Sequence, residues 1–308
     1  ANHYSNDKVT LDNIIVWQEQ EPVEKLKKGD LIITEVLFNP FPGGKDYVEI
    51  FNPGKEKLPV DFLYIANRDK NLELKQLWPV FNARFIFQPG SYLVITTDNT
   101  SITNYYNTKC PECICIVNKM PAFNIDEGFV VLLNEESEII DEMHYTEEMH
   151  SSFLRNSKGV SLEKLSVHNP SADNANWHSA SSGSGYGTPG YVNSQIENRS
   201  GLSPEVIFEP GSFSPDLDGF NDQFNIKYSL DKPGYVANVK IFDSSGRFLM
   251  SLIKNELLGT EGVITWDGKD VTGQNKPMGI YIVTMEIFNR HGELYHFKDA
   301  VVLTGLLE

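Results

Sequence analysis

Three aspartates, Asp216, Asp218 and Asp222, crowd the run SFSPDLDGFND at residues 212–222. Calcium prefers carboxylate oxygens, and a loop of the EF-hand type also has a glycine at its sixth position. With Gly219 at that position the three aspartates fall on ligand positions, although Ser and Asn replace the first Asp and the last Glu. The run therefore predicts either a weak calcium site or a turn in which the aspartates bond to nearby backbone amides.

Two further carboxylates, Glu35 and Glu49, stand inside the apolar runs IITEVLF and YVEIF. Such a pair could act as general acid and base if a cleft held both groups and raised one pKa. We expect the simpler role, in which each carboxylate caps backbone amides or faces solvent. YVEIF itself is predicted as a half-buried strand that feeds the Asn-Pro-Gly turn after it.

Other chemical residue sets lack the spacing that their chemistry requires. In HYTEEMH, His144 and His150 are six residues apart, whereas a zincin needs histidines four apart on a helix. DNANWHSAS contains Asp, His and Ser but no Gly-x-Ser-x-Gly turn, and we expect its Trp177 to fill a core. There is no phosphate-binding loop or dinucleotide fingerprint. We therefore predict a non-catalytic protein without a firm cofactor, calcium being the one candidate.

The cysteines Cys110, Cys113 and Cys115 all lie in CPECICI. A local disulfide, which would leave one thiol free, and reduced buried thiols are both open readings. A metal site is disfavoured, because a closed zinc site needs four ligands and no histidine lies nearby in the sequence.

The net charge and the lengths of the apolar runs limit the classes of partner. The 308 residues carry a formal net charge of -16, with a pI near 4.9. Such a surface repels phosphate backbones, so nucleic acid is not an expected partner. No apolar run reaches the roughly 20 residues of a membrane span. Because the sequence starts with Ala and not Met, we expect it to be a piece of a longer protein.

Strand signals dominate and predict an all-β fold. Short β-branched and aromatic runs alternate with Asn-Pro, Pro-Gly and Asp-Gly turn pairs, and only NLELKQLW is predicted as a short helix or turn. A Gly- and Ser-rich stretch before Pro204 is costly to order and predicts a boundary. The expected divisions are a strand and linker from a preceding module (1–29), a first β-sandwich (30–195), a linker (196–203) and a second β-sandwich (204–306).

The first of these regions carries an ordered set of motifs, namely DLIITEVLFNP, DYVEIFNPG, FQPGSYLVIT, KGVSLEKL and NWHSASSGSGYGTPGYVNSQ. The set resembles the bacterial lamin-tail domain, an immunoglobulin-like sandwich that also forms the tail of nuclear lamins. Thr34 departs from the Asn that is usual in the family. The resemblance implies a binding or structural module. It also implies an alternative, because bacterial lamin-tail domains resemble modules found beside extracellular nucleases and phosphatases.

The second region contains FSPDLDGFND, SLDKPGYVANVKIFD and TWDGKDVTGQNKPMGIYIV. These resemble the immunoglobulin-like domain related to the flagellar hook-capping protein, which is common at the C-termini of secreted and surface proteins. Locally we predict a hairpin turn at residues 243–246, a strand that ends at Trp266 and a tight turn at Asp267-Gly268. In the strand after Gly279 the more apolar face is expected to be Tyr281, Val283, Met285 and Ile287.

Together these features predict two immunoglobulin-like sandwiches in tandem. They would form a non-catalytic region of a larger bacterial protein that is secreted, periplasmic or exposed at the cell surface, and would serve in attachment or module presentation. The expected partners are an unknown protein or a cell-surface glycan, together with neighbouring modules of the same polypeptide. The alternative is an accessory region of an extracellular nuclease or phosphatase whose catalytic domain lies outside this chain.

Overall fold

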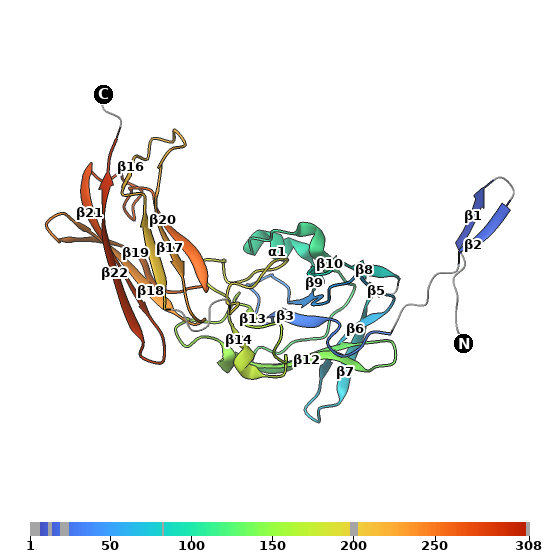
Figure 1. The fold of residues 1–308 in the computed structure, drawn as a ribbon. Helices are drawn as coiled ribbons and strands as arrows, with labels where there is room; N and C mark the ends of the chain where they lie inside the picture. Colours follow the sequence, from blue (N-terminus) through green and yellow to red (C-terminus); the bar gives the residue numbers. More distant parts are fainter. Residues whose placement is uncertain (1–6, 12–13, 19–24, 82, 198–202, 306–308) are drawn as a thin grey trace.

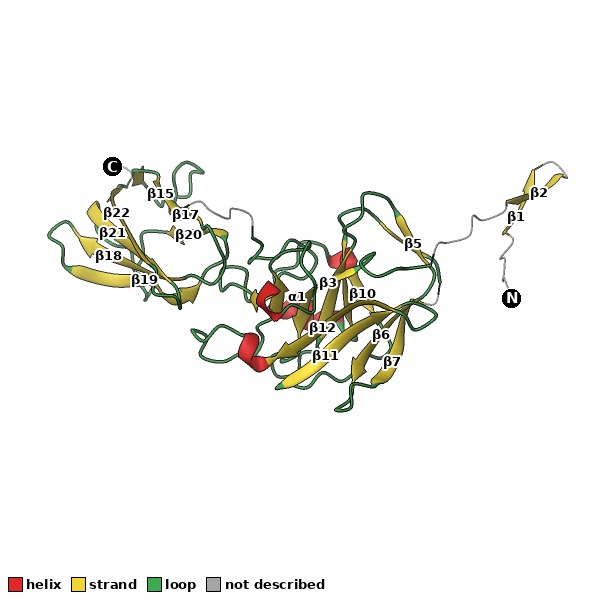
Figure 2. Ribbon diagram, turned by 60° about the horizontal axis from the view of Figure 1, so that its bottom comes forward, coloured by secondary structure: helices red, strands yellow, loops and turns green. Residues whose placement is uncertain are grey.

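The structure is a computed structural model that describes residues 7–11, 14–18, 25–81, 83–197 and 203–305. Nearly all of its regular elements are strands (Figure 2), so the predicted all-β fold is confirmed. The described helices are short: α1 (Asn99–Tyr105), η1 (Pro111–Cys113), η2 (Glu147–Met149) and η3 (Asn174–Asn176). Within the predicted N-terminal segment, β1 (Asp7–Leu11) pairs antiparallel with β2 (Ile14–Gln18).

The first sandwich packs a six-stranded sheet against a four-stranded sheet (Figure 1). The six strands, in spatial order, are β10 (Ile114–Ile116), β9 (Tyr92–Thr96), β4 (Tyr47–Phe51), β3 (Ile32–Leu37), β13 (Leu162–Lys164) and β14 (Trp177–Ser179). The four are β12 (Ile139–Thr146), β11 (Glu127–Leu133), β6 (Leu63–Arg68) and β7 (Leu74–Phe81). A small pair, β5 (Leu58–Val60) and β8 (Phe85–Phe87), lies beside them.

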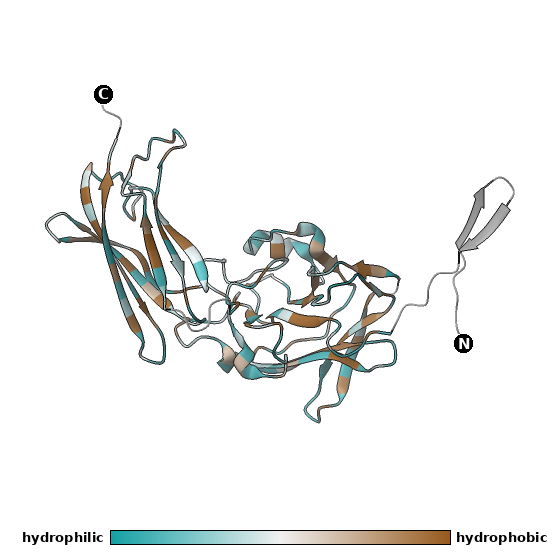
Figure 3. Ribbon diagram, in the orientation of Figure 1, coloured by the Kyte–Doolittle hydropathy of each residue, from teal (hydrophilic) through white to brown (hydrophobic). Residues whose placement is uncertain are grey.

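The second sandwich is built from a three-stranded and a five-stranded sheet. The first consists of β15 (Glu205–Glu209), β17 (Phe224–Ser229) and β20 (Glu261–Trp266). The second consists of β16 (Ser212–Phe213), β22 (Leu294–Leu303), β21 (Gly279–Phe288), β18 (Val236–Asp243) and β19 (Phe248–Leu257). Each sandwich encloses its own apolar core, and the hydrophobic residues follow the strands in Figure 3.

Local turn and face predictions hold in the second sandwich. Along β21 the buried side chains are the predicted set, Tyr281, Val283, Met285 and Ile287. β20 ends at Trp266, and Gly268 has a φ of 77°, which glycine adopts without strain. The amide of Gly246 donates to the carbonyl oxygen of Asp243 and closes the hairpin between β18 and β19.

Two local predictions need correction. NLELKQLW begins in the turn between β6 and β7, as predicted, but its larger part forms most of the edge strand β7 and no helix. β4 is buried on both faces, and not on one. One face of the six-stranded sheet contacts the four-stranded sheet, while Tyr47 on the other face packs against Ile102 of α1 and Tyr106. Residues 186–195 cover the remainder of that second face through the hydrogen bonds described below.

The two sandwiches are joined by main-chain hydrogen bonds, and we call residues 181–196 and 257–260 the joint. The amide of Ser182 donates to the carbonyl oxygen of Leu257 at 2.9 Å, and the amide of Thr260 donates to the carbonyl oxygen of Ser194 at 2.9 Å. The side-chain amide of the buried Gln195 donates to the carbonyl oxygen of Leu258, also at 2.9 Å. The joint thus connects the end of the first sandwich directly to the loop between β19 and β20.

Side chains extend this contact beyond the joint. The rings of Phe153 and Phe288 meet edge to face with their centroids 5.6 Å apart. His178 lies against Gly234, where an added Cβ would come within 3.0 Å of its Nε2. Burial lowers the pKa of His178, and the charge of nearby Arg290 lowers it further. Several elements therefore contribute contacts between the two sandwiches.

Candidate functional site

The predicted aspartates lie in the loop between β16 and β17. Carboxylate oxygens of Asp216, Asp218 and Asp222 come within 4.8 Å of one another, which is close enough to share a cation. The same groups also shape the loop. The amide of Asp218 donates to Asp216 at 3.2 Å, the amide of Phe220 to Asp218 at 2.7 Å and the amide of Gly219 to Asp222 at 3.0 Å. The predicted turn bonds are therefore present, and calcium stays a prediction.

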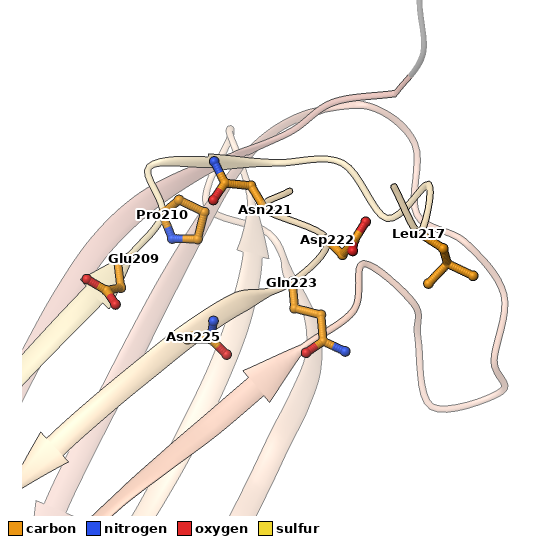
Figure 4. Close-up of a pocket in the computed structure, with 7 residues that line it drawn as sticks. All are labelled: Glu209, Pro210, Leu217, Asn221, Asp222, Gln223 and Asn225. Carbon is orange, nitrogen blue, oxygen red and sulfur yellow. The ribbon is translucent and has the colours of Figure 1, made fainter. Parts of the chain in front are cut away.

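Beside this loop is an open hollow of about 690 Å³, shown in Figure 4. Strand ends and the loop supply its lining side chains, which are mostly polar: Glu209, Pro210, Leu217, Asn221, Asp222, Gln223 and Asn225. One carboxylate oxygen of Asp222, Oδ1, is buried and has no hydrogen-bond partner within the described residues. The loop also exposes two large apolar side chains, with Leu217 at 88% and Phe220 at 73% of their surface. Unused polar groups and exposed apolar ones thus meet at one place.

The other predicted carboxylates belong to a row of three buried glutamates. Glu35 on β3 lies directly opposite Glu49 on β4 and directly opposite Glu163 on β13. All three are 0% exposed. The sequence indicated the first two but not Glu163, because which residue lies beside Glu35 depends on the pairing of strands more than 100 residues apart. We call these residues the glutamate row.

Glu35, at the centre of the row, accepts hydrogen bonds from three elements. The Tyr47 hydroxyl donates to its Oε1 at 2.7 Å, and the Ser161 hydroxyl donates to the same oxygen. The backbone amide of Thr188 also donates to Oε1, at 2.9 Å. This carboxyl therefore secures the loop segment 186–195 to the middle of the sheet.

The two outer glutamates cap the same segment. Glu49 accepts from the backbone amide of Gly190 at 2.7 Å and from the Thr34 hydroxyl at 2.7 Å. Glu163 accepts from the backbone amide of Gln195 at 3.0 Å and from the Ser194 hydroxyl at 2.8 Å. The expectation that Glu35 and Glu49 cap amides describes this geometry; neither faces solvent. Thr34 is thus a hydrogen-bond donor to Glu49.

Burial dominates the electrostatics of the glutamate row. It raises the pKa of Glu35, although the Ser161 and Thr188 donors oppose that rise. Burial and the charge of Glu35 together raise the pKa of Glu49 well above its ordinary value. The same two causes raise the pKa of Glu163 to about 8. Because like charges cannot all ionise in this setting, the row holds protons at neutral pH. Full burial denies it access to a substrate, so its geometry fits a structural role.

The histidines of HYTEEMH point to different partners. His144 Nε2 lies 2.9 Å from a carboxylate oxygen of Glu127, while Glu147 accepts from Ser157 at 2.8 Å. His150 Nδ1 lies 2.9 Å from the Ser179 hydroxyl, a pairing that the sequence did not indicate. Burial, with a smaller effect of His178, lowers the pKa of His150 to about 4. Ser179 is 0% exposed, which keeps this Ser-His pair away from any substrate.

The first sandwich also contains a buried lysine that the sequence did not indicate. Lys164 is 2% exposed and donates to the hydroxyl of Ser171, which in turn donates to Asp141 at 2.5 Å. Burial lowers the pKa of Lys164 to about 8. The same Asp141 carboxylate accepts the amide of Ile33 at 2.8 Å. This network connects β12 and β13 to the start of β3.

The three cysteines are divided between a disulfide and a free thiol. Cys110 and Cys113 form a disulfide, and Cys115 is a free, partly buried thiol. Burial raises the pKa of the Cys115 thiol, which disfavours the reactive thiolate. Among the described residues, the one group of His, Cys, Asp or Glu with metal-site spacing is the aspartate loop. None of the helices in the described ranges has the length and apolarity to span a membrane.

Comparisons with known proteins identify no family for this chain. No protein-family model matches the sequence, and no curated protein matches significantly. Similar solved structures include PorU of Porphyromonas gingivalis, in a dimeric latent form (10% identity, TM-score 0.27, 90% of this chain and 20% of that chain). PorZ, a surface component of the type-IX secretion system in that bacterium, aligns at 13% identity and a TM-score of 0.22 over 87% of this chain and 38% of that chain.

CopC from Methylosinus trichosporium OB3b aligns at 11% identity and a TM-score of 0.22, over 34% of this chain and 98% of that chain. This chain thus spans a fifth to two fifths of the length of PorU and PorZ. All three TM-scores are far below 0.5.

Proposed function

We propose that this chain is a non-catalytic binding and spacer region of a larger bacterial protein that is secreted or exposed at the cell surface. In this proposal the first sandwich is of the lamin-tail type and the second of the hook-capping type, as their motifs suggest. The pair attaches or presents neighbouring modules of the same polypeptide. The motif resemblance is a family-level inference, so the physical support has to come from the sandwiches themselves.

The joint is the observation that carries this proposal. A flexible linker would leave two sandwiches free to rotate, whereas here main-chain bonds from Ser182 and Thr260 cross between them. Glu163 holds Ser194 and Gln195 on the first sandwich, while the same two residues bond to the second. A rigid pair of domains fixes the separation and direction of whatever each end carries. That is the property a spacer needs.

Two further features support an extracytoplasmic location and a non-catalytic role. The Cys110–Cys113 disulfide is stable in oxidising compartments and rare in the bacterial cytoplasm. The carboxylates of the glutamate row and the Ser179–His150 pair are enclosed by protein. Assays of the chain with p-nitrophenyl phosphate and with DNA should show no hydrolysis above background. Turnover that a point substitution in this chain abolishes would refute the non-catalytic proposal.

The spacer proposal is tested by measuring the distance between the sandwiches. Spin labels, introduced as non-natural amino acids at exposed Lys55 and Lys298, are expected to give one narrow distance distribution. Gly259→Ala should broaden it, because the added Cβ would lie 2.7 Å from the carbonyl oxygen of Ser194 across the joint. Gly211→Ala is the matched control, since no atom lies within 4 Å of its added Cβ. A broad distribution in the parent chain would refute the proposal.

A further inference from the structure

The hollow beside the aspartate loop contains hydrogen-bonding groups that the protein itself leaves unused. The side-chain amides of Asn221 and Gln223 line it, are exposed and make no hydrogen bond within the described part of the chain. The amide oxygen of Asn225 accepts from Thr265 at 3.0 Å, which leaves its amino group toward the hollow free. Figure 4 shows these amides placed around the same space, between the end of β15 and the loop.

The chemistry of this lining matches hydroxyl groups. An amide side chain offers both donors and acceptors, as a sugar hydroxyl does. The lining Leu217, 88% exposed, and the adjacent Phe220, 73% exposed, provide apolar surface for the C–H face of a sugar ring. We propose that the hollow binds a neutral glycan. This deepens the proposed function, on which it rests, by assigning the ligand class of the binding region.

Charge selects neutral over acidic glycans. The carboxylates of Glu209 and Asp222 line the hollow, and the whole chain carries -16. The Asp222 carboxylate and the net charge of the chain would repel the carboxylates of sialic or uronic acids, whereas Glu209 is paired with Lys227. A cationic peptide is the competing occupant. It fits less well, because Lys227 already pairs with Glu209 at 2.5 Å, and most of the remaining polar groups are neutral amides.

The test is a titration followed by NMR, performed in EDTA so that only side chains and no cation contribute. The neutral probes are maltotriose, mannotriose and chitotriose; the acidic probes are trigalacturonate and sialyllactose; tetralysine represents cationic peptides. Gln223→Ala removes an exposed amide from the hollow, and Asn221→Gly removes another while keeping a residue that tolerates positive φ (52° here). Gln274→Ala is the matched control, because it removes an exposed amide outside the hollow.

We expect at least one neutral trisaccharide to bind and to shift resonances of the hollow. Gln223→Ala and Asn221→Gly should each weaken that binding roughly five-fold, the size of one net hydrogen bond, with Gln274→Ala unchanged. The proposal is overturned if no neutral probe binds, if acidic probes bind equally well, if tetralysine alone binds, or if Gln223→Ala and Asn221→Gly have no effect. The distance measurement across the joint is independent, so a failure here is distinguishable from a failure of the spacer proposal.

Discussion

Each sandwich contains a cluster of three carboxylates, and the two clusters are opposite in nature. The glutamate row is 0% exposed, and its oxygens accept hydrogen bonds from several elements that are distant in sequence. The aspartates of the second sandwich lie on a surface loop and bond only to backbone amides two or three residues away. The same functional group therefore joins distant elements in one domain and shapes a single loop in the other. The two clusters differ in burial and in the sequence separation between the carboxylates and their hydrogen-bond donors.

The largest expected effect follows from removing the centre of the glutamate row. Glu35→Ala leaves the hydroxyls of Tyr47 and Ser161 and the amide of Thr188 without their acceptor. We expect a loss of about 3 to 5 kcal/mol in the free energy of unfolding, measured by urea denaturation. Glu35→Gln, which keeps one acceptor oxygen, should lose clearly less. A loss under about 1 kcal/mol for the alanine variant would show that the row is not structural.

The pH dependence of stability should distinguish the clusters next. Since folding raises the pKa of Glu163 from 4.5 to about 8, the folded state binds this proton more tightly than the unfolded chain. Its contribution is complete below pH 4.5 and is lost as the pH rises through 8, with a slope of at most about 1.4 kcal/mol per pH unit. Melting temperatures should therefore fall between pH 6.5 and pH 8, the part of this interval that lies above the titration range of His150.

Glu163→Gln is expected to flatten that alkaline slope, because it removes the titrating group while keeping an acceptor for Gln195. On the acid side, His150 should make stability change with pH in the opposite direction. Folding lowers the pKa of His150 from 6.5 to about 4, so its contribution is lost as the pH falls through that interval. A parent chain that becomes more stable between pH 6.5 and pH 8 would contradict the assignment of protons to the glutamate row.

Calcium tests the aspartate loop. With a dissociation constant of about 1 mM, as in weak extracellular sites, roughly 10 mM calcium would add about 1.4 kcal/mol of stability. Thermal unfolding with calcium, and with magnesium as an ionic-strength control, measures this. Asp218→Ala should abolish the gain, whereas Asp299→Ala, an exposed aspartate outside the loop, should retain it. Absence of a calcium effect on the parent chain would reduce the loop to its turn function.

The smallest effect is expected at the tip of the same loop. Leu217→Ser should change the free energy of unfolding by less than about 0.5 kcal/mol, because the side chain is already 88% exposed. Urea denaturation of this variant and of Glu35→Ala under the same conditions compares their losses in the free energy of unfolding directly. A loss above about 1 kcal/mol would mean that the loop, like the glutamate row, carries part of the fold.

Much of the fold was predictable because its signals are local. Alternation along β21 identified the buried Tyr281 and Val283, and the turn at Gly246 follows from a residue that tolerates positive φ. β7 was missed for an equally local reason. Its first four residues are exposed and include good helix formers such as Leu, Lys and Gln, so no alternation marked it as a strand.

The candidate sites were predictable only where they lie within one loop. The spacing of Asp216, Asp218 and Asp222 was visible because a single loop contains all of them. The glutamate row required the register of β3 against β13, and its enclosure required the segment 186–195 to cover the sheet. Both depend on contacts between distant residues. The prediction of a half-buried β4 failed for the same reason, since its second face is covered by chain that follows much later.

The short pair of β16 and β22 gives the second sandwich a mechanical property. These strands run parallel, with Ser212 opposite Val302 and Phe213 opposite Leu303. Tension that pulls the start of β16 and the end of β22 in opposite directions loads sideways the two main-chain hydrogen bonds at this pair, from Val302 to Gly211 and from Thr304 to Phe213, so that both must break together. Such a shear clamp resists force better than strands that peel apart bond by bond. These few residues would add resistance to pulling along the second sandwich.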